Sequence, residues 1–467
     1  MPDERFEDHL RHPRGRGREL SGAHHGAAGG AACGDLVRLS VAVEGARVAA
    51  VAFEAAGCGA TIAAASAAVE LAEGAGLLEA ARIGAPQIAA ELGGLSAGKL
   101  HAADLASDAL HRALGAAVRA HGRLEARPGR TLVAMSGGVD SAVAALLSAE
   151  EPGCEVVAVT LELWADPEND GERSCCSAAA VRGARRVAHG LGLAHFTLDL
   201  RDEFRAGVVA PWLSEHADGQ TPNPCVRCNG HVRLDAMLAF GASLGAATLT
   251  TGHYARRTPE GLLRLAADPA KDQTYMLAAL SRTALARLRF PLGELTKPQV
   301  RALAVRAGLD IANKPDSQDL CFLAGTGRAS FLARHGGMHD RPGDIVDRAG
   351  AVVGRHDGHH GFTVGQRRGL GGGSLQPLYV LATDARANTV TVGPRAELAT
   401  RTVRVRGLRM HGATPDAVRL RYRSPAVGCR LEGDAVLLDE PFDGAAPGQT
   451  AVFLAGDAIV GCATIAA

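Results

Sequence analysis

Three cysteines stand in sequence contexts that favour sulfur or metal chemistry. Cys225 and Cys228 lie within Thr221-Pro222-Asn223-Pro224-Cys225-Val226-Arg227-Cys228-Asn229, and Cys321 lies within Asp316-Ser317-Gln318-Asp319-Leu320-Cys321-Phe322. A thiolate can hold a persulfide and can attack carbon. If two such cysteines meet in the fold, one can carry the persulfide while the other resolves it by forming a disulfide.

Two kinds of metal site are alternatives to this persulfide relay. A structural zinc site at Cys225 and Cys228 needs two further ligands at similar spacing, and the sequence holds no second Cys-x-x-Cys. Alternatively, Cys225, Cys228 and Cys321 could hold a [4Fe–4S] cluster that leaves one iron open for exogenous sulfide. The sequence leaves the persulfide relay and the cluster both open.

A glycine-rich segment predicts a nucleotide site. Ser136-Gly137-Gly138-Val139-Asp140-Ser141 follows an apolar strand-like run and opens a helical one. The glycines let the backbone approach an anion, the helix N-terminus offers free amides, and Asp140 could bind Mg²⁺. The segment lacks the Gly-Lys-Ser/Thr of a Walker loop. It resembles the loop of ATP pyrophosphatases, which adenylate a carbonyl oxygen and release pyrophosphate.

The cysteine motifs select among those enzymes, because together they resemble the tRNA-specific 2-thiouridylase family. The resemblance runs from about residue 130 to the C-terminus and includes these further motifs: Thr251–Arg256, Lys271–Gln273, Phe290–Gly293, Gly365–Gly369 and Arg421–Arg423. It implies ATP-dependent 2-thiolation of the wobble uridine of tRNA, through an adenylated intermediate and a cysteine persulfide, with release of AMP and pyrophosphate. It makes Cys228 the nucleophile and Cys321 the persulfide carrier.

The same resemblance implies two sets of ligand contacts. ATP would contact Ala134, Met135, Ser136, Gly137, Gly138, Val139, Asp140, Ser141, Leu161 and Gly252. The tRNA would contact Asn223, Pro224, Cys225, His253, Lys271, Asp272, Gln273, Arg421, Tyr422 and Gln449. One form of the family has an aspartate where this chain has Cys225, and that aspartate is implied to help in acid–base or base-positioning work. Cys225 is therefore a candidate for an auxiliary role, and the aspartate's own role is in doubt here.

A second resemblance covers residues 1–120. Asp8-His9-Leu10, Ala32–Asp35, Gly57-Cys58-Gly59 and Lys99-Leu100-His101 resemble the U-type iron–sulfur cluster scaffold. It implies cluster ligation by Cys33, Asp35, Cys58 and His101. The family's third cysteine follows the histidine, where this chain has Ala102. A weakened cluster site and a degenerate scaffold that docks a cysteine desulfurase therefore both remain open.

The elements that must position these residues indicate an α/β chain with four domains. Strand-like runs at 36–43 and 47–53 and helical stretches at about 60–75, 78–93 and 102–120 predict a small α+β scaffold-like domain, residues 1–125. Residues 123–130 look like a linker. Strands at 131–135, 155–161, 195–200 and 248–251 alternate with helices, which predicts a doubly wound parallel-sheet domain over 130–323. We expect two further domains after it. The first is a central tRNA-binding domain without a clear helix (324–390), and the second is a C-terminal β-barrel (391–467) with Thr389–Val392 as its first strand.

The amino-acid composition limits which partners and which cellular location fit the chain. The 467 residues carry 50 basic and 50 acidic side chains, so any RNA-binding surface must be local. No apolar run reaches the roughly 20 residues that a membrane-spanning helix needs. We expect a cytoplasmic enzyme, a tRNA uridine sulfurtransferase that uses ATP, Mg²⁺ and a sulfur donor (a cysteine desulfurase or persulfide carrier protein). The alternatives are an iron–sulfur assembly or carrier protein with an RNA-binding half, and another amidating synthetase, which would not need Cys228 and Cys321.

Overall fold

The computed structural model describes residues 4–29, 34–166, 177–315, 320–323, 325–370 and 376–467. These form two compact units: the first contains residues 1–201, 236–253 and 287–322, and the second contains 202–235, 254–286 and 323–467. Among the described helices, none is both long and apolar enough to cross a membrane.

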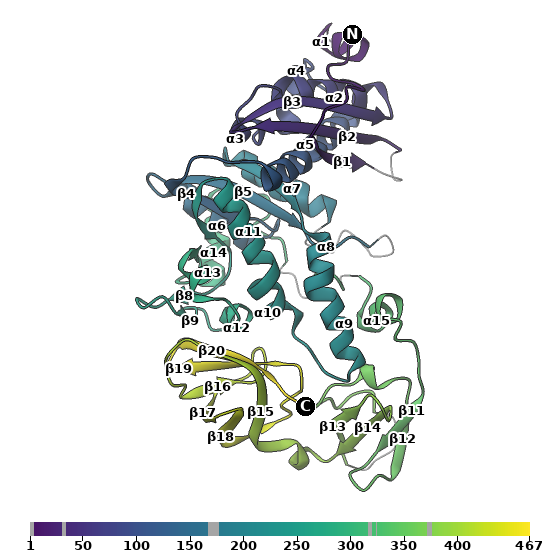
Figure 1. Ribbon diagram of the computed structural model, residues 1–467, viewed down its shortest axis with the longest axis vertical. Helices are drawn as coiled ribbons and strands as arrows, with labels where there is room; N and C mark the ends of the chain where they lie inside the picture. The colour runs from purple at the N-terminus through teal and green to yellow at the C-terminus, as the bar shows by residue number, and fades with distance from the viewer. Residues whose placement is uncertain (1–3, 30–33, 167–176, 316–319, 324, 371–375) are drawn as a thin grey trace. The chain divides into compact units, whose positions relative to one another are not determined.

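The N-terminal part of the first unit is an antiparallel sheet backed by helices (Figure 1). The predicted strand pair is confirmed as β2 (Leu36–Glu44) and β3 (Arg47–Ala56), with Glu44 opposite Arg47 at the turn. Alternate side chains of β2 are buried, as one-sided packing requires. The sequence analysis missed a third strand, β1 (His24–Gly29), which pairs with β2.

The helices of this part are α1 (Glu4–Arg11), α2 (Gly59–Ala72), α3 (Leu77–Ala80), α4 (Ala85–Glu91), η1 (Ala97–Lys99) and α5 (Leu100–Ala120). The single helix predicted over 78–93 is wrong, because the chain breaks between α3 and α4. Gly84 precedes α4 in an extended conformation, and Pro86 stands in the first turn of α4. A proline fits there because the first helical amides have no partner within the helix.

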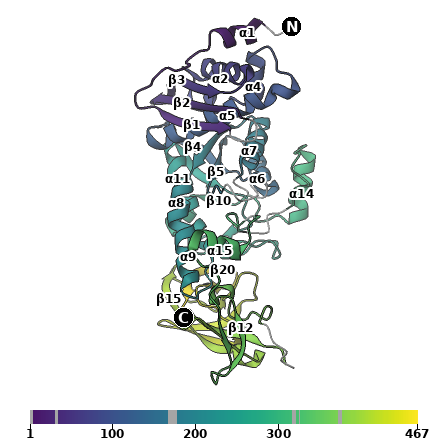
Figure 2. The same cartoon turned by 90° about the vertical axis from the view of Figure 1, so that its right-hand side faces the viewer.

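The doubly wound domain is confirmed. Its parallel sheet has the order β10-β7-β4-β5-β6, and α6 and α7 lie on one face while α11 lies on the other (Figure 2). The strands are β4 (Arg127–Ala134), β5 (Glu155–Glu162), β6 (Ala194–Asp199), β7 (Ala246–Thr250) and β10 (Leu288–Arg289). The helices are α6 (Val139–Glu150), α7 (Ala178–Gly190), α11 (Leu234–Ser243) and α14 (Lys297–Arg306).

The linker predicted over residues 123–130 is largely sheet-bound instead. The amide of Leu124 donates to the Ser243 carbonyl, and that of Arg127 donates to the Gly245 carbonyl. The pairing of β4 with β7 shifts register between Arg127 and Thr131. This irregularity places Pro128, which has no amide hydrogen, inside a strand without breaking the ladder.

Helix α5 joins the N-terminal part to the doubly wound domain within the first unit. A side chain at Gly115 of α5 would place its Cβ 1.9 Å from the Thr197 carbonyl oxygen of β6, so the helix and strand backbones touch. Asp108 of α5 pairs with Arg185 of α7, and both side chains are almost fully buried. We call this contact the α5 seam. It makes the N-terminal part an integral layer of the first unit.

The second unit contains short helices, a central sheet and a barrel. Its helices are α8 (Arg201–Phe204), η3 (Arg205–Val209), α9 (Ala210–Ala217), α10 (Pro224–Cys228), η4 (Asn229–Arg233), α12 (Thr274–Leu277), α13 (Arg282–Ala286), α15 (Arg328–Gly336), η5 (His359–Gly361) and η6 (Arg395–Leu398). Helix α15 corrects the expectation of no helix after Ala324. It buries Phe331 and Leu332 and ends at Gly337 in a left-handed conformation.

The central sheet has the order β12-β11-β14-β13: β11 (Gly343–Val346), β12 (Val352–His356), β13 (Tyr379–Asp384) and β14 (Thr389–Gly393). The predicted strand Thr389–Val392 therefore belongs to the central sheet, where Val390 and Val392 are buried, and not to the barrel. Its apolar alternation fits either sheet, so only the pairing decided between them.

The barrel is confirmed. Six strands close through the pairing of β15 with β20, and the short hairpin β8–β9 extends the sheet beside β20. The strands are β15 (Ala399–Met410), β16 (Ala417–Arg419), β17 (Val427–Glu432), β18 (Ala435–Asp443), β19 (Thr450–Ala455) and β20 (Ala458–Ile465), with β8 (Arg256–Arg257) and β9 (Leu263–Arg264). Strand β16 has three residues and ends at Arg419.

Candidate nucleotide, thiol and metal sites

The predicted phosphate loop lies at the carboxyl end of β4, where doubly wound sheets bind ligands. The Ser141 hydroxyl donates to the Gly138 carbonyl at 3.0 Å and accepts from the Ser136 amide at 3.1 Å. The Ser136 and Ser141 hydroxyl oxygens are 3.2 Å apart. These bonds fold the loop over the N-terminus of α6, so its amides are gathered for an anion.

Two glycines are required by the loop. Gly137 has φ +70°, and a Cβ there would lie 2.8 Å from the Ala180 carbonyl oxygen. Gly252, which follows β7, would place a Cβ 2.7 Å from the Ser141 amide nitrogen. The structure therefore brings Gly252 against the loop, as the sequence analysis predicted for an ATP contact. Leu161, the other predicted contact outside the loop, is buried on β5.

Two lysines that the sequence analysis missed also reach the loop. The Lys297 ammonium donates to both carboxylate oxygens of Asp140, at 2.7 and 2.8 Å. The Lys314 ammonium donates to the Gly137 carbonyl at 2.9 Å. The sequence could have drawn attention to these two residues, because the chain has only four lysines among its 50 basic residues.

The Cys225–Cys228 segment forms the short helix α10 in the second unit. The Asn223 side-chain oxygen caps it by accepting from the amides of Cys225 at 3.1 Å and Val226 at 3.4 Å. Cys225 is half-buried and Cys228 is buried. The cap and Pro224 fix the start of the helix, so both cysteines stand on one rigid turn.

Cys321 belongs to the first unit, where it is half-buried. Its neighbour Phe322 is buried and contacts the Trp164 ring edge to face, with centroids 6.4 Å apart. Residues 316–319 of its motif lie outside the described residues. Because Cys228 and Cys321 belong to different units, their approach stays a prediction.

The predicted tRNA contacts have different surroundings. The Asp272 side chain is 7% exposed and its carboxylate accepts from Arg419 at 3.1 Å, while the Gln273 side-chain oxygen accepts from the Tyr254 amide at 3.0 Å. Gln449 donates to the Thr221 carbonyl at 2.6 Å. These three side chains therefore join segments of the second unit that are distant in sequence or lie in different loops.

Four further predicted contacts are likewise partly exposed. His253 and Lys271 are half-buried. Arg421 donates to the carbonyls of Val364 and Gly444, and the Tyr422 ring lies 5.8 Å from the Tyr275 ring.

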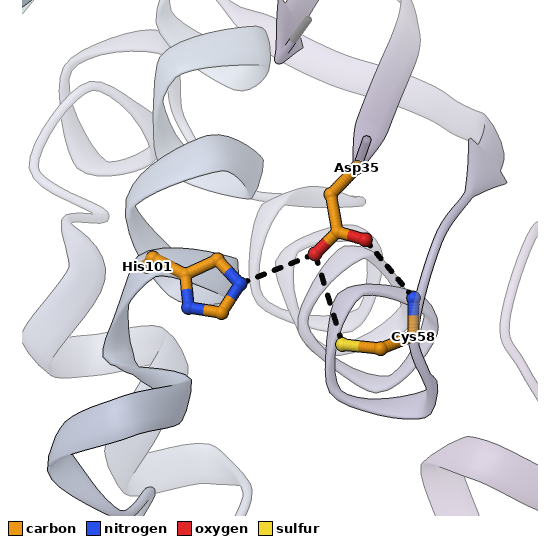
Figure 3. Close-up of side chains that lie close together, drawn as sticks. All are labelled: Asp35, Cys58 and His101. Atoms are coloured by element: carbon orange, nitrogen blue, oxygen red, sulfur yellow. Dashed lines mark hydrogen bonds and ion pairs between the residues drawn. The ribbon is translucent and has the colours of Figure 1, made fainter. Parts of the chain in front are cut away.

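In the N-terminal part, three predicted metal ligands converge. Asp35, Cys58 and His101 offer ligand atoms that all lie within 4.8 Å of one another (Figure 3). They come from the start of β2, the residue before α2 and the first turn of α5. We call this group the N-terminal triad. Cys33, the fourth predicted ligand, lies outside the described residues.

Hydrogen bonds fix the central carboxylate of the triad. Asp35 accepts from the Thr61 hydroxyl at 2.8 Å, from His101 Nε2 at 3.1 Å and from the Cys58 amide at 3.1 Å. Burial alone would raise the pKa of Asp35, but these bonds hold that pKa below its usual value. The charged carboxylate is therefore the favoured form.

The donor set of the triad limits what it can hold. Thiolate, imidazole and carboxylate suit a single divalent ion such as zinc, and iron–sulfur clusters are mostly held by thiolates. Ala102, which stands at the family's third cysteine position, is fully buried. With Cys33, the site would have at most two thiolates, so it fits a cluster less well than the full scaffold ligand set does.

Four family models match successive parts of the chain. They are the NifU-like N terminal domain over residues 3–121, the tRNA methyl transferase HUP domain over 129–325, the tRNA methyl transferase PRC-barrel domain over 329–394 and the aminomethyltransferase beta-barrel domain over 400–465. These matches define the class of the chain: a tRNA-modifying PP-loop enzyme joined to a NifU-like domain.

Individual relatives narrow that class. The bifunctional protein NifU/MnmA of Rubrobacter xylanophilus is 45% identical over 468 residues, covering 96% of this chain and 95% of that protein. The tRNA-specific 2-thiouridylase MnmA of Thermobifida fusca is 45% identical over 72% of this chain and 95% of its own length. The chain belongs to the family of bifunctional NifU/MnmA proteins. A solved U34-tRNA thiolase, NcsA from Methanococcus maripaludis, is 17% identical with a TM-score of 0.29, over 42% of this chain and 63% of its own.

Proposed function

We propose that the protein is an ATP-dependent tRNA uridine 2-sulfurtransferase acting on the wobble uridine. The observation that carries the proposal is the phosphate loop: two hydroxyls, a carboxylate and a helix N-terminus gathered at one strand end, with Gly252 closed against it. Family membership connects that loop to thiolation. An iron–sulfur carrier would need neither the loop nor the thiol helix α10.

The chemistry follows from the residue types. The uridine O2 attacks the α-phosphorus of ATP and pyrophosphate leaves. The terminal sulfur of a Cys321 persulfide then bonds to C2, and AMP departs with the former O2. The Cys228 thiolate attacks the Cys321 sulfur as the thiouridine is released, which leaves a disulfide that a thiol reductant must reopen. Cys225 has an auxiliary role beside Cys228.

Mg²⁺ fits the loop because the Asp140 carboxylate keeps an exposed fraction of 31% and Mg²⁺ prefers oxygen ligands. When bound, the ion would neutralise phosphate charge. The Ser136 and Ser141 hydroxyls and the α6 amides would hold the phosphates in place. We assign the predicted tRNA contacts to the second unit and to His253, and place the enzyme in the cytoplasm, where tRNA and ATP are found.

For the N-terminal triad we propose a sulfur-supply role, in which Asp35, Cys58 and His101, with Cys33, bind a divalent metal or a labile cluster or receive sulfur from a donor such as a cysteine desulfurase. Support comes from the convergence of three ligand types at one point. The α5 seam makes the full-length protein the right material for testing this role.

The decisive experiment is mass spectrometry of tRNA nucleosides from cells that lack this chain, with and without a plasmid copy. We expect 2-thiouridine derivatives to disappear and to return with the wild-type copy. Unchanged 2-thiouridine in the deletion strain would reject the proposed function. Reaction of the purified protein with ATP, inorganic polysulfide as the persulfide-level sulfur donor, a thiol reductant and unmodified tRNA would then assign the activity to the protein itself.

A further inference from the structure

A buried lysine outside the phosphate loop holds the loop's only carboxylate. Lys297 is the first residue of α14, and its side chain is 9% exposed. Its ammonium contacts both oxygens of Asp140, while the Asp140 side chain is 31% exposed. The lysine therefore lies on the buried side of the carboxylate, and the carboxylate keeps an accessible side.

The chemistry of the pair leaves the carboxylate able to bind a metal. An ionised carboxylate offers about four lone-pair sites, and the Asp140 side chain keeps an exposed fraction of 31%, so a cation can reach it from solvent. A buried ammonium without an anion would be costly, so the contact is strongly favoured. The pair thereby restricts the carboxylate to one orientation at the start of α6.

The choice of lysine supports a specific role. Arginine supplies 46 of the 50 basic side chains, yet two of the four lysines, Lys297 and Lys314, reach this one loop from different segments. A lysine presents a compact point charge, whereas the flat fork of an arginine would cover more of the carboxylate.

We propose that Lys297 is a positioning residue of the nucleotide site, which holds Asp140 in the orientation that binds the divalent cation of metal–ATP. The inference rests on the proposed ATP-dependent function. It adds a residue that acts through Asp140 and touches neither the phosphates nor the metal. The same ion pair could instead only anchor α14 to α6, and the experiment below separates the two roles.

The test is a double-mutant cycle measured by direct binding of Mn²⁺ in the presence of ATP, with electron paramagnetic resonance of free Mn²⁺ as the readout. Lys297→Met, Asp140→Asn and the double variant are compared with wild type, without tRNA. We expect Lys297→Met to weaken ATP-dependent Mn²⁺ binding about tenfold in the wild-type background and less than twofold in the Asp140→Asn background, because coupled residues are non-additive.

Two further variants keep the result interpretable. Arg306→Met removes a charge from the exposed last turn of the same helix and should leave Mn²⁺ binding unchanged. If Lys297→Met melts too low for measurement, Lys297→Arg replaces it. The arginine keeps the ion pair, and because its fork covers more of the carboxylate it should still bind Mn²⁺ more weakly than wild type. An equal loss from Lys297→Met in both backgrounds, or no loss in either, would overturn the proposal. Because wild-type Mn²⁺–ATP binding needs no tRNA, a failure of thiolation would reject the proposed function without touching this result.

Discussion

The phosphate loop and the N-terminal triad are two candidate sites built at the same kind of place, the junction of a strand and a helix, yet they differ in completeness. The loop relies on backbone amides, required glycines and short hydroxyls, and hydrogen bonds within the loop hold Ser136 and Ser141 together. The triad depends on side-chain ligands, and one ligand position is occupied by the buried Ala102.

The two sites should therefore respond differently to amino-acid substitutions. A site made of backbone is fixed by the fold, so it persists as long as β4 and α6 form. A site made of ligands loses function by single substitutions that leave the fold intact, since a buried alanine packs as well as a cysteine. The chain therefore joins a candidate phosphate site made largely of backbone to a candidate metal site in which one expected ligand position is an alanine.

The largest expected effect is on the thiols of the catalytic half. Cys228→Ser and Cys321→Ser should each reduce 2-thiouridine formation below a tenth of wild type, because a hydroxyl cannot carry or resolve persulfide sulfur. ATP and tRNA binding should stay near normal. Cys154→Ser, at a half-buried thiol whose pKa burial raises, is the matched control. Retention of more than a tenth of the activity by either variant would reject the assigned roles.

The next effect concerns the phosphate loop. Asp140→Asn or Ser136→Ala should slow tRNA-dependent pyrophosphate release about a hundredfold, the usual cost of removing one preorganised group that stabilises transition-state charge. Pyrophosphate production from labelled ATP measures it. Full-rate release in both variants would make the loop a purely structural turn and would remove the contrast with the triad.

A smaller effect on catalysis is expected at the triad. Cys58→Ala in the full-length protein should abolish zinc or iron binding by the N-terminal part, measured as metal per chain after anaerobic reconstitution. Thiolation with inorganic polysulfide, which supplies sulfur at the oxidation level of a persulfide, should change less than twofold, because no residue of the triad has a role in the proposed relay. If Cys58→Ala also abolished thiolation with polysulfide, sulfur transfer at Cys321 would depend on the triad.

The same reconstitution separates the two catalytic mechanisms. Iron that survives Cys58→Ala but is lost together with activity in Cys225→Ala would favour a cluster at Cys225, Cys228 and Cys321. An iron-free protein that thiolates tRNA at full rate would establish the persulfide relay.

The smallest effect is on stability and concerns the α5 seam that joins the two regions. Burial lowers the pKa of His111 to about 4 and that of His189 to about 3. Protons therefore favour the unfolded chain, so stability is constant above pH 6.5 and falls as the pH drops from 6.5 toward 4. Each histidine should cost about 2 kcal/mol by pH 5.

Thermal melting between pH 4.5 and 7.5 measures this effect. His189→Gln should flatten the pH dependence of Tm, whereas His12→Gln, at an exposed histidine, should not. An identical pH dependence of Tm in wild type and His189→Gln would show that His189 does not cause the loss of stability at low pH.

The sequence alone was sufficient for the features that depend on local chemistry. The phosphate loop, the α10 motif and the strand–helix alternation each combine a periodicity with residue types that few other structures need, such as Gly137 at φ +70°. The fold class and the family followed from these. The scaffold-like nature of the N-terminal part followed from motifs around Asp35, Cys58 and His101.

The tertiary structure decided what depends on partners distant in sequence. Lys297 lies 157 residues from Asp140 in the sequence, and the residues that flank Lys297 do not predict the contact. Thr389–Val392 alternates as any half-buried strand does, so only pairing assigned it to the central sheet. The α5 seam likewise depends on Gly115, Asp108 and Arg185 meeting across two domains. Local patterns report the conformation of a segment, whereas burial and ion pairing are set by whatever the fold brings against it.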